Sequence, residues 1–490
     1  MTQEQYAFEP VPLDVLIIGA GLSGIGAAHA LSSQCPDKRY LILERRAAIG
    51  GTWDLFRYPG IRSDSDMYTL SYSYKPWANR KSIADGADIK RYIEEIAEDS
   101  GAIHNIRFQR RVVSANWSSE HGRWDVVALL TDAEGNEQEE HYQARFLFSC
   151  SGYYSYDEGY RPAFPNEEAF KGQIIHPQFW PEDLDYTGKR VVVIGSGATA
   201  VTLVPAMTRT AAHVTMLQRT PSYVVARPQR DGVAQTLQKW LPLQAAHSLT
   251  RWKNVFLTQF FYRIARNRPE QFKERVLHMV KTQIGDVDMK HFTPDYKPWD
   301  QRVCAVPDGD LFRDVRAGRA SVVTDTIDSF TENGIRLSSG EELEADIIVT
   351  ATGLKVNALG DVTVCVDGQP MRFNERMSYK GMMLSDVPNM IVTFGYTNAS
   401  WTLKAELTAN YACRLLRYMD KHHYRTAVVR RDPSVQEQPF LDFTSGYVQR
   451  AANVLPKQGD RAPWQVHQSY LKDKLTIQYG RIDDGVMQFQ

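Results

Sequence analysis

Two stretches of the chain share one pattern of apolar and small residues. In each stretch, a run of mostly β-branched residues is followed by closely spaced small residues and then by a helical pattern. The runs are Val15–Ile18, followed by Gly19, Gly21 and Gly24, and Val191–Ile194, followed by Gly195, Gly197 and Ala200. This pattern predicts a buried strand, a tight turn and a helix packed on the strand, twice in one chain.

The remaining patterns predict a meander, further helices and two crossing points. Apolar residues at helical spacing predict a helix over 88–98, and alternating apolar and polar positions predict a β-meander over 112–144. Strands that end in glycine are expected at 146–152 and 347–353, where we expect the chain to cross between two domains. Aromatic and basic residues are interleaved over 233–300, which we interpret as a helical subdomain.

These elements predict an α/β protein with two Rossmann-like dinucleotide-binding domains, the second inserted into the first. We expect residues 1–154 to form the first part of the first domain and 345–490 its second part. The inserted domain is expected over 155–344, with its helical insertion at about 233–300. A plain βαβ crossover that binds nothing is the alternative for each glycine turn.

The residues that follow the two glycine turns differ in charge. Glu44 and Arg219 each lie about 20 residues beyond the last small residue of their turn, where the second strand of the unit ends. A carboxylate there accepts hydrogen bonds from ribose hydroxyls, whereas a guanidinium suits a 2′-phosphate. The chain is therefore predicted to hold two nucleotides, the second of them NADP.

The composition argues against several kinds of site and partner but does not indicate a function. The 490 residues carry a formal net charge of −1, which gives no reason to expect nucleic acid as a partner. The five cysteines show no CxxC or other metal spacing, so we expect neither a metal site nor disulfides, and a redox cysteine pair like that of disulfide reductases is not indicated. We expect a cytoplasmic protein, because the apolar stretch after residue 14 lacks the basic flank of a signal peptide.

One motif between the two glycine turns narrows the chemistry. Residues 170–181 read FKGQIIHPQFWP, with Phe170, Gly172, His176 and Trp180 at fixed spacing. A second motif runs from Gly50-Gly51-Thr52-Trp53 through Tyr58-Pro59-Gly60 to Asp64. With these motifs the chain resembles the class B flavoprotein monooxygenases of the Baeyer–Villiger type, whose signature is FxGxxxHxxxWP. The segments 293–312 and 395–404 resemble most closely those of the ethionamide-activating subgroup.

The resemblance implies FAD in the first domain and NADPH in the second. Expected FAD contacts are Gly19, Gly21, Ser23, Gly24, Glu44, Gly51, Thr52, Trp53, Asp64, Val112 and Ser400. Expected NADP contacts are Gly195, Ser196, Gly197, Ala198, Thr199, Ala200, Arg219, Thr220 and Gln301. Asp300 and Gln301 stand where better-known relatives carry a more basic pair, which puts one phosphate contact in doubt.

The resemblance also implies a catalytic arginine, which Arg302 matches, with Asp64 as the carboxylate that orients it by paired hydrogen bonds. A solvated arginine and a helix-capping aspartate are the alternatives. His176 is expected to be a hinge residue rather than a proton donor, and Trp53 could line the cofactor or belong to the core. Tyr58, Tyr68 and Tyr72 fit packing as well as substrate contact.

The expected reaction is a Baeyer–Villiger oxidation that uses NADPH and O2. Reduced flavin adds oxygen at C4a, and the peroxide attacks a ketone carbonyl to give an ester or lactone. Oxygenation of sulfur or nitrogen is the main alternative, followed by an oxidase that releases hydrogen peroxide and by a flavin-bound redox sensor. We expect a small apolar ketone or thioether as substrate. No run of 18 apolar residues exists to span a bilayer, but the 233–300 region leaves weak peripheral membrane association open.

Overall fold

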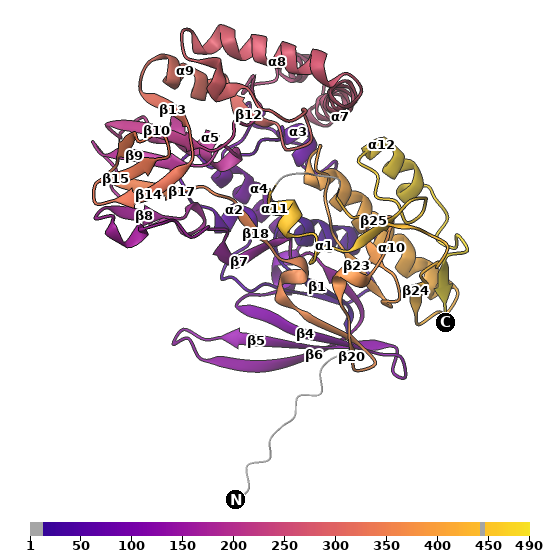
Figure 1. Ribbon diagram of the computed structural model, residues 1–490. Helices are drawn as coiled ribbons and strands as arrows, with labels where there is room; N and C mark the ends of the chain where they lie inside the picture. The colour runs from indigo at the N-terminus through magenta and orange to yellow at the C-terminus, as the bar shows by residue number, and fades with distance from the viewer. Residues whose placement is uncertain (1–12, 442–445) are drawn as a thin grey trace, which may run out of the picture.

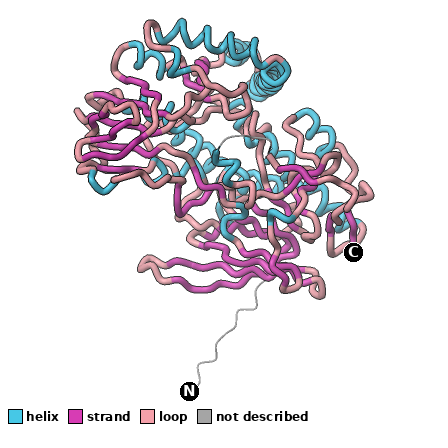
Figure 2. The backbone as a smooth tube through the Cα atoms, in the orientation of Figure 1, coloured by secondary structure: helices cyan, strands magenta, loops and turns pink. Residues whose placement is uncertain are grey.

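The computed structural model describes residues 13–441 and 446–490. Two large sheets form separate lobes, and a group of helices lies over one end of the second lobe (Figures 1 and 2). A nine-stranded sheet has the order β20-β19-β4-β5-β6-β1-β2-β3, with β23 paired to β6, and a five-stranded sheet has the order β13-β10-β9-β17-β8.

The first sheet joins a core of parallel strands to an antiparallel meander. The core contains β1 (Leu13–Ile18), β2 (Tyr40–Leu43), β3 (Ile106–Arg107) and β23 (Met390–Val392), and the meander contains β4 (Arg110–Ser118), β5 (Arg123–Thr131) and β6 (Glu137–Ser149). The long strand β6 belongs to both, because Glu137–Ala144 pair with β5 while Ala144–Ser149 pair with β1. The predicted meander and its direct continuation into the parallel part of the sheet are therefore confirmed.

Helices cover the parallel part of this sheet. The small residues of α1 (Leu22–Gln34) let it pack between β1 and α10 (Trp401–Lys421), in a core that includes Ile25, Ala28 and Leu31. The helix predicted over 88–98 is α4 (Gly86–Asp99), and it buries Ile89, Tyr92, Ile93 and Ile96. The short helices α2 (Thr52–Leu55) and α3 (Met67–Leu70) lie between α1 and α4 in sequence.

The second sheet is entirely parallel and contains the second glycine turn. Its strands are β8 (Gln173–Ile175), β9 (Arg190–Ile194), β10 (His213–Gln218), β13 (Ala320–Thr324) and β17 (Ile347–Thr350). α5 (Ala198–Met207) follows β9, and α9 (Asp310–Arg316) precedes β13. The expected boundary at residue 345 falls before β17, but β17 pairs with β9 and β8, so the chain leaves this sheet only after Thr350.

Both crossings between the sheets run through one narrow two-stranded ribbon, which we call the linker ribbon. β7 (Tyr154–Gly159) leaves the first sheet, β18 (Leu354–Val356) leaves the second, and the two pair antiparallel. Each strand directly follows one of the two glycine endings, at Gly152 and Gly353. The predicted crossing points are therefore confirmed, and the chain passes between lobes twice at the same place.

The segment 233–300 is largely helical, as predicted. It contains α6 (Gly232–Trp240), α7 (Leu243–Asn267) and α8 (Pro269–Ile284), and β11 (Val224–Arg227) and β12 (Cys304–Pro307) pair on either side of it. The C-terminal part of the chain returns to the first lobe, where α12 (Tyr470–Asp473) packs near α7 (Figure 1).

Smaller elements complete the described structure. They are β14 (Ile327–Thr331), β15 (Gly334–Leu337), β16 (Glu342–Glu344), β19 (Thr363–Val366), β20 (Gln369–Pro370), β21 (Ser378–Tyr379), β22 (Met383–Leu384), β24 (Ala427–Val429), β25 (Glu437–Pro439), α11 (Gly446–Arg450), β26 (Lys457–Gly459) and β27 (Met487–Phe489). Among the described helices, none is both long and apolar enough to cross a membrane.

Candidate active site

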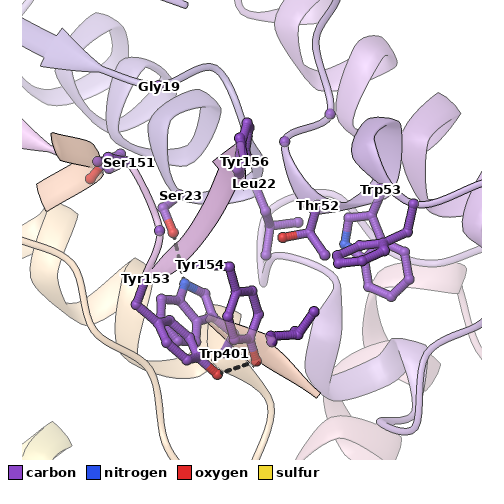
Figure 3. A pocket seen from close by; sticks show the side chains of 18 of the residues that line it. Gly19, Leu22, Ser23, Thr52, Trp53, Ser151, Tyr153, Tyr154, Tyr156 and Trp401 are labelled. Atoms are coloured by element: carbon purple, nitrogen blue, oxygen red, sulfur yellow. Dashed lines mark hydrogen bonds between the residues drawn. The ribbon is translucent and has the colours of Figure 1, made fainter. Parts of the chain in front are cut away.

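A cavity of about 340 Å³ lies where the two lobes meet, and it is reached by the first glycine turn and by the helix that follows the second. Its wall includes the start of α1, the start of α2, the start of α5 and the loop before β12. Figure 3 shows that aromatic side chains from α10 and from the segment that enters β7 close one side of the cavity. The site is thus assembled from segments far apart in sequence.

The first glycine turn has no room for side chains at its key positions. Gly19 has φ +98°, and a Cβ at this residue would lie 2.7 Å from the carbonyl oxygen of Cys150. A Cβ at Gly24 would lie 1.8 Å from the carbonyl oxygen of Gly19, so this glycine allows α1 to pack directly on the turn. Gly21 and Gly51 approach closely, which brings the turn and the start of α2 together at the cavity wall. The backbone N–H groups at the start of α1 can therefore approach a phosphate.

Glu44 lies in the cavity wall with a nearly buried side chain. Its Oε2 accepts a hydrogen bond from the Ala20 N–H at 2.7 Å, and its Oε1 accepts one from the Arg46 N–H at 2.9 Å. Burial raises the pKa of this carboxyl group, and the two backbone donors act in the opposite direction. Each carboxylate oxygen keeps a further lone pair, which is the acceptor capacity that ribose hydroxyls need.

A buried ion cluster fixes the helix that carries Thr52 and Trp53. The side chain of Asp54 is 2% exposed and accepts from Lys90 of α4 at 2.7 Å and from Arg46 at 2.8 Å. Burial raises the pKa of Asp54, but the hydrogen bonds from Lys90 and Arg46 outweigh it and hold that pKa below its usual value. The ion pairs of Asp54 therefore hold α2 in place, and with it the side chain of Trp53 in the cavity wall.

The aromatic side of the cavity is an ordered stack. Trp401 at the start of α10 donates from Nε1 to Ser23 Oγ at 2.8 Å, and its ring stacks on Tyr153 at 5.2 Å between centroids (Figure 3). Tyr153 and Tyr154 share a hydrogen bond between their hydroxyl groups at 2.6 Å. No local pattern in the sequence singles out these residues, because aromatic side chains after a strand are also typical of the core. The stack lines the cavity with apolar surface and links α10 to the first glycine turn.

The second glycine turn contributes the start of α5 to the cavity. Ala198 and Thr199 line it, whereas Gly195, with φ +138°, lies behind them against Ala351. Ser196 Oγ donates to the carbonyl oxygen of Thr220 at 3.0 Å, so the turn and the end of β10 are held together. Arg219 is exposed beside this contact and does not line the cavity.

Arg302 and Asp64 meet across the cavity although 238 residues separate them. Arg302 Nη1 donates to Asp64 Oδ2 at 3.4 Å, and both side chains are 37% exposed. This contact is looser than the paired hydrogen bonds that we expect for the two groups. Nearby, Arg62 of the cavity wall pairs with Asp310 of α9 at 2.5 Å, a second ion pair between the lobes.

The residues of the FKGQIIHPQFWP motif do not line the cavity. Phe170 packs in a core of the second lobe, Gln173–Ile175 form β8, and His176 lies against the linker ribbon. His176 is packed against Gly159 of β7, where a Cβ would lie 1.9 Å from the imidazole Cε1. Its Nδ1 accepts from the Gln178 N–H at 3.2 Å, and burial lowers the pKa of the ring. This placement agrees with a hinge residue and offers no route for direct proton transfer to the cavity.

The structure brings most of the expected FAD contacts together. Those that line the cavity are Gly19, Gly21, Ser23, Glu44, Gly51, Thr52, Trp53, Asp64 and Val112. Ser400 is buried behind the wall, where its hydroxyl group is 2.6 Å from that of Thr69. Among the expected NADP contacts, Ala198 and Thr199 line the cavity, whereas Gly197, Thr220 and Gln301 do not.

The sequence left the roles of Tyr58, Tyr68 and Tyr72 open, and the structure separates Tyr58 from the other two. Tyr58 lines the cavity, and burial raises its pKa to about 12, while a hydrogen bond with Thr199 acts against that shift. Tyr68 and Tyr72 are almost fully buried and do not reach the cavity wall. Tyr58 is therefore a candidate contact for a ligand, whereas the other two pack.

Comparison with known proteins places the chain in a family. Residues 13–359 match the family described as "Flavin-binding monooxygenase-like". The chain is 53% identical over 488 residues to the "FAD-containing monooxygenase EthA" of Mycobacterium tuberculosis, with 97% of each chain covered. It is 49% identical over 481 residues to the "Probable FAD-binding monooxygenase AlmA" of an Acinetobacter species, with 97% of this chain and 96% of the relative covered.

Solved structures show the same fold at lower identity. An oxidized steroid monooxygenase bound to NADP matches with a TM-score of 0.76 at 21% identity, covering 98% of this chain and 99% of that chain. A cyclohexanone monooxygenase bound to ε-caprolactone matches with a TM-score of 0.75 at 19% identity, covering 98% and 100%. These likenesses confirm the predicted fold class.

Proposed function

The chain belongs to the flavin-binding monooxygenase-like family, and on that premise we propose that it is an FAD- and NADPH-dependent enzyme that inserts one oxygen atom of O2 beside the carbonyl of a small apolar ketone. The product would be an ester or a lactone. One observation carries the proposal: the helix starts that follow both glycine turns and the Arg302–Asp64 pair line a single cavity. A reductant site and a carbonyl-activating cation would thus face the same space.

The residues of the first lobe fit FAD. The start of α1 would hold the pyrophosphate, because its glycines leave the backbone N–H groups accessible and the helix N-terminus favours negative charge. Glu44 would accept from the ribose hydroxyls, and Thr52 and Trp53 would lie against the ring system. When bound, FAD would accept hydride from NADPH and, once reduced, activate O2. We assign this role to the domain built on the nine-stranded sheet.

The residues of the second lobe fit NADP, in a domain that extends from the linker ribbon through β17. The start of α5 would hold its pyrophosphate, and Arg219 with Thr220 would hold the 2′-phosphate at the end of β10. The exposure of Arg219 suits this part of the ligand, because an adenosine phosphate lies at the far end from the nicotinamide. Gln301 stands where a basic contact is expected, so we propose that it donates a neutral hydrogen bond instead.

Arg302 would act on the substrate carbonyl. When the carbonyl carbon is attacked, negative charge develops on its oxygen, and a fixed guanidinium stabilises that charge electrostatically. Asp64 would hold the guanidinium toward the cavity. The stacked rings of Tyr153 and Trp401 would limit the access of water to the same space, which protects the activated oxygen from release as hydrogen peroxide.

The solvent exposure of the Arg302 guanidinium favours a second reaction, oxygenation of a thioether sulfur. The guanidinium is 37% exposed, so water screens its charge more than it would screen the charge of a buried group. A soft sulfur nucleophile attacks electrophilic oxygen directly and develops no oxyanion of its own. Sulfur oxygenation therefore depends less on Arg302 than ketone oxygenation does.

Product analysis separates these reactions. The FAD-loaded protein is incubated with NADPH, air and one member of a panel of linear ketones, cyclic ketones and thioethers, and the products are identified by mass spectrometry. Esters or lactones in proportion to NADPH consumed would support the proposal. Sulfoxides without esters would support the second reaction, and hydrogen peroxide as the sole product across the panel would contradict both.

A further inference from the structure

The long helix α7 has its polar side inward and its aromatic side outward. Its buried residues include His247, Thr250, Arg251 and Asn254. Its outer side carries Leu249, Phe256, Leu257, Phe260 and Phe261, which are between 44% and 56% exposed. A surface helix of a globular protein normally shows the opposite arrangement, with the apolar face toward the core. The exposed apolar side of α7 therefore needs a partner.

The inward side of α7 is firmly attached to the first lobe. His247 shares a hydrogen bond with Ser71 at 2.9 Å, Arg251 pairs with Glu406 at 2.8 Å, and Asn254 donates to Asp66 at 2.8 Å. These contacts fix the rotation of α7 about its axis. The phenylalanines therefore cannot turn into the core by a rotation of the helix, and their exposure is a stable property of the fold.

Further exposed apolar residues lie on the segments next to α7. Leu249, Phe256, Phe260 and Arg263 follow one another at spacings that place them on one side of the helix. Trp240 at the end of α6 is 82% exposed, and Leu475 and Tyr479, which follow α12, are each 66% exposed. Trp252 of α7 packs on Tyr470 of α12 at 6.0 Å, so the surface continues from the helical group onto the first lobe. We call this surface, centred on the outer side of α7, the α7 face.

The charge around the α7 face favours an anionic partner. Residues 232–269 contain six basic residues and no acidic residue, although the whole chain has a formal net charge of −1. Three of the six form ion pairs, Arg251 with Glu406, Lys253 with Asp231 and Arg266 with Asp300. Lys239, Arg263, Arg266 and Arg268 of this stretch are exposed. A second copy bound through the same face would bring two groups of like charge together, which opposes a symmetric dimer. A bilayer with anionic headgroups offers the complementary charge and an apolar layer for the rings.

We propose that the α7 face binds the surface of an anionic lipid bilayer. The phenylalanine rings would enter the boundary between headgroups and acyl chains, and the arginines would extend their charged ends to the lipid phosphates. In Figure 1 this helical group lies at the end of the molecule opposite the β4–β6 meander, where a flat surface can approach it. The binding is peripheral and does not depend on the oxygenase activity proposed above.

Vesicle flotation tests the proposal. Purified FAD-loaded protein is mixed with vesicles of phosphatidylcholine, with or without about 30% phosphatidylglycerol, and the bound fraction is measured after flotation. We expect binding to the anionic vesicles that falls as salt is added. Combined Phe256→Ser and Phe260→Ser substitutions should weaken it about tenfold or more. Combined Arg263→Glu and Arg268→Glu substitutions should weaken it about thirtyfold or more.

Matched controls lie elsewhere on the surface. Phe179, 52% exposed at the base of the linker ribbon, is changed to Ser, and Arg372, near the meander, is changed to Glu. Both controls should bind anionic vesicles like the unchanged protein, and thermal melting should show that every variant is folded. Failure of the unchanged protein to bind anionic vesicles would overturn the proposal. So would equal binding by the double variants and the controls, or self-association in sedimentation velocity that requires Phe256 and Phe260 and occurs without vesicle binding.

Discussion

At the residue scale, the role proposed for the charge of Arg302 can be separated from cofactor reduction. Arg302→Ala should lower ketone oxygenation by about a hundredfold to a thousandfold, because it removes the cation proposed to stabilise the developing oxyanion. Anaerobic reduction of bound FAD by NADPH, followed as loss of visible absorbance, should persist. Arg302→Lys should restore part of the activity, because it returns a point charge without the planar geometry. Normal ester formation by the Ala variant would remove the assigned role.

Arg219 should determine the choice between NADPH and NADH. Replacement by Ala removes a charge-assisted contact to the 2′-phosphate and should raise the KM for NADPH about tenfold to a hundredfold, with little change for NADH. Steady-state kinetics with both nucleotides measures the difference. Arg209, an exposed arginine near the end of α5, provides the control as Arg209→Ala. An equal loss with both nucleotides in the Arg219 variant would contradict the assignment.

The sequence predicted the position of those cavity residues that belong to a recurring local backbone pattern. Gly19 and Glu44 were predictable because the turn geometry and the strand end recur in dinucleotide-binding units. Tyr153 and Trp401 were not, because their stack depends on a contact between segments more than two hundred residues apart. The pairing of Arg302 with Asp64 was predicted from family resemblance, but only the structure shows that the two groups are 3.4 Å apart.

At the element scale, the attachment of α7 makes stability depend on pH. His247 is fully buried, and burial, helped by the Arg251 charge, lowers its pKa to about 4. The unfolded state, with an ordinary histidine pKa, takes up a proton as pH falls below about 6.5, whereas the folded state resists until about 4. Stability is therefore lost across this window as pH falls. The cost attributable to His247 between about pH 7 and pH 5 is roughly 2 kcal/mol.

The variant His247→Gln should lack this part of the pH dependence. Urea unfolding at the two pH values gives the free energy of unfolding for the unchanged protein, for His247→Gln and for His278→Gln, an exposed histidine of α8. The His278 variant should retain the pH dependence of the unchanged protein. If the His247 variant retains it as well, then His247 is not the group responsible.

Elements with a strong local pattern were predictable, and pairings between distant strands were not. The meander and α4 follow from alternation and helical spacing. The apolar run of β17 predicts a buried strand, but nothing local states which sheet it joins, so the expected boundary at residue 345 fell one strand early. The inverted polarity of α7 was visible only as interleaved aromatic and basic residues, because sequence alone does not show which side of a helix faces the protein.

At the scale of the whole molecule, two lobes are joined by the ribbon of β7 and β18, and His176 is wedged against it. A Cβ at Gly159 would overlap the imidazole, so Gly159→Ala should displace His176 and alter how the lobes move together. We expect a lower rate of NADPH-driven flavin reduction with unchanged FAD content. Stopped-flow absorbance measures the rate. Gly232→Ala is the control, because a Cβ there meets no atom within 4 Å. An unchanged rate in the Gly159 variant would argue against a coupling role for the ribbon.

If the cavity shared by the two lobes is the active site of a ketone oxygenase, one oxygen atom of O2 enters the substrate there. The most direct test supplies isotopically labelled oxygen, 18O2, to the FAD-loaded protein with NADPH and a ketone, and measures the mass of the product. We expect an ester or lactone that carries one labelled atom, with this product strongly reduced in the Arg302→Ala variant. NADPH consumption that yields only labelled hydrogen peroxide, with the ketone recovered unchanged, would contradict it.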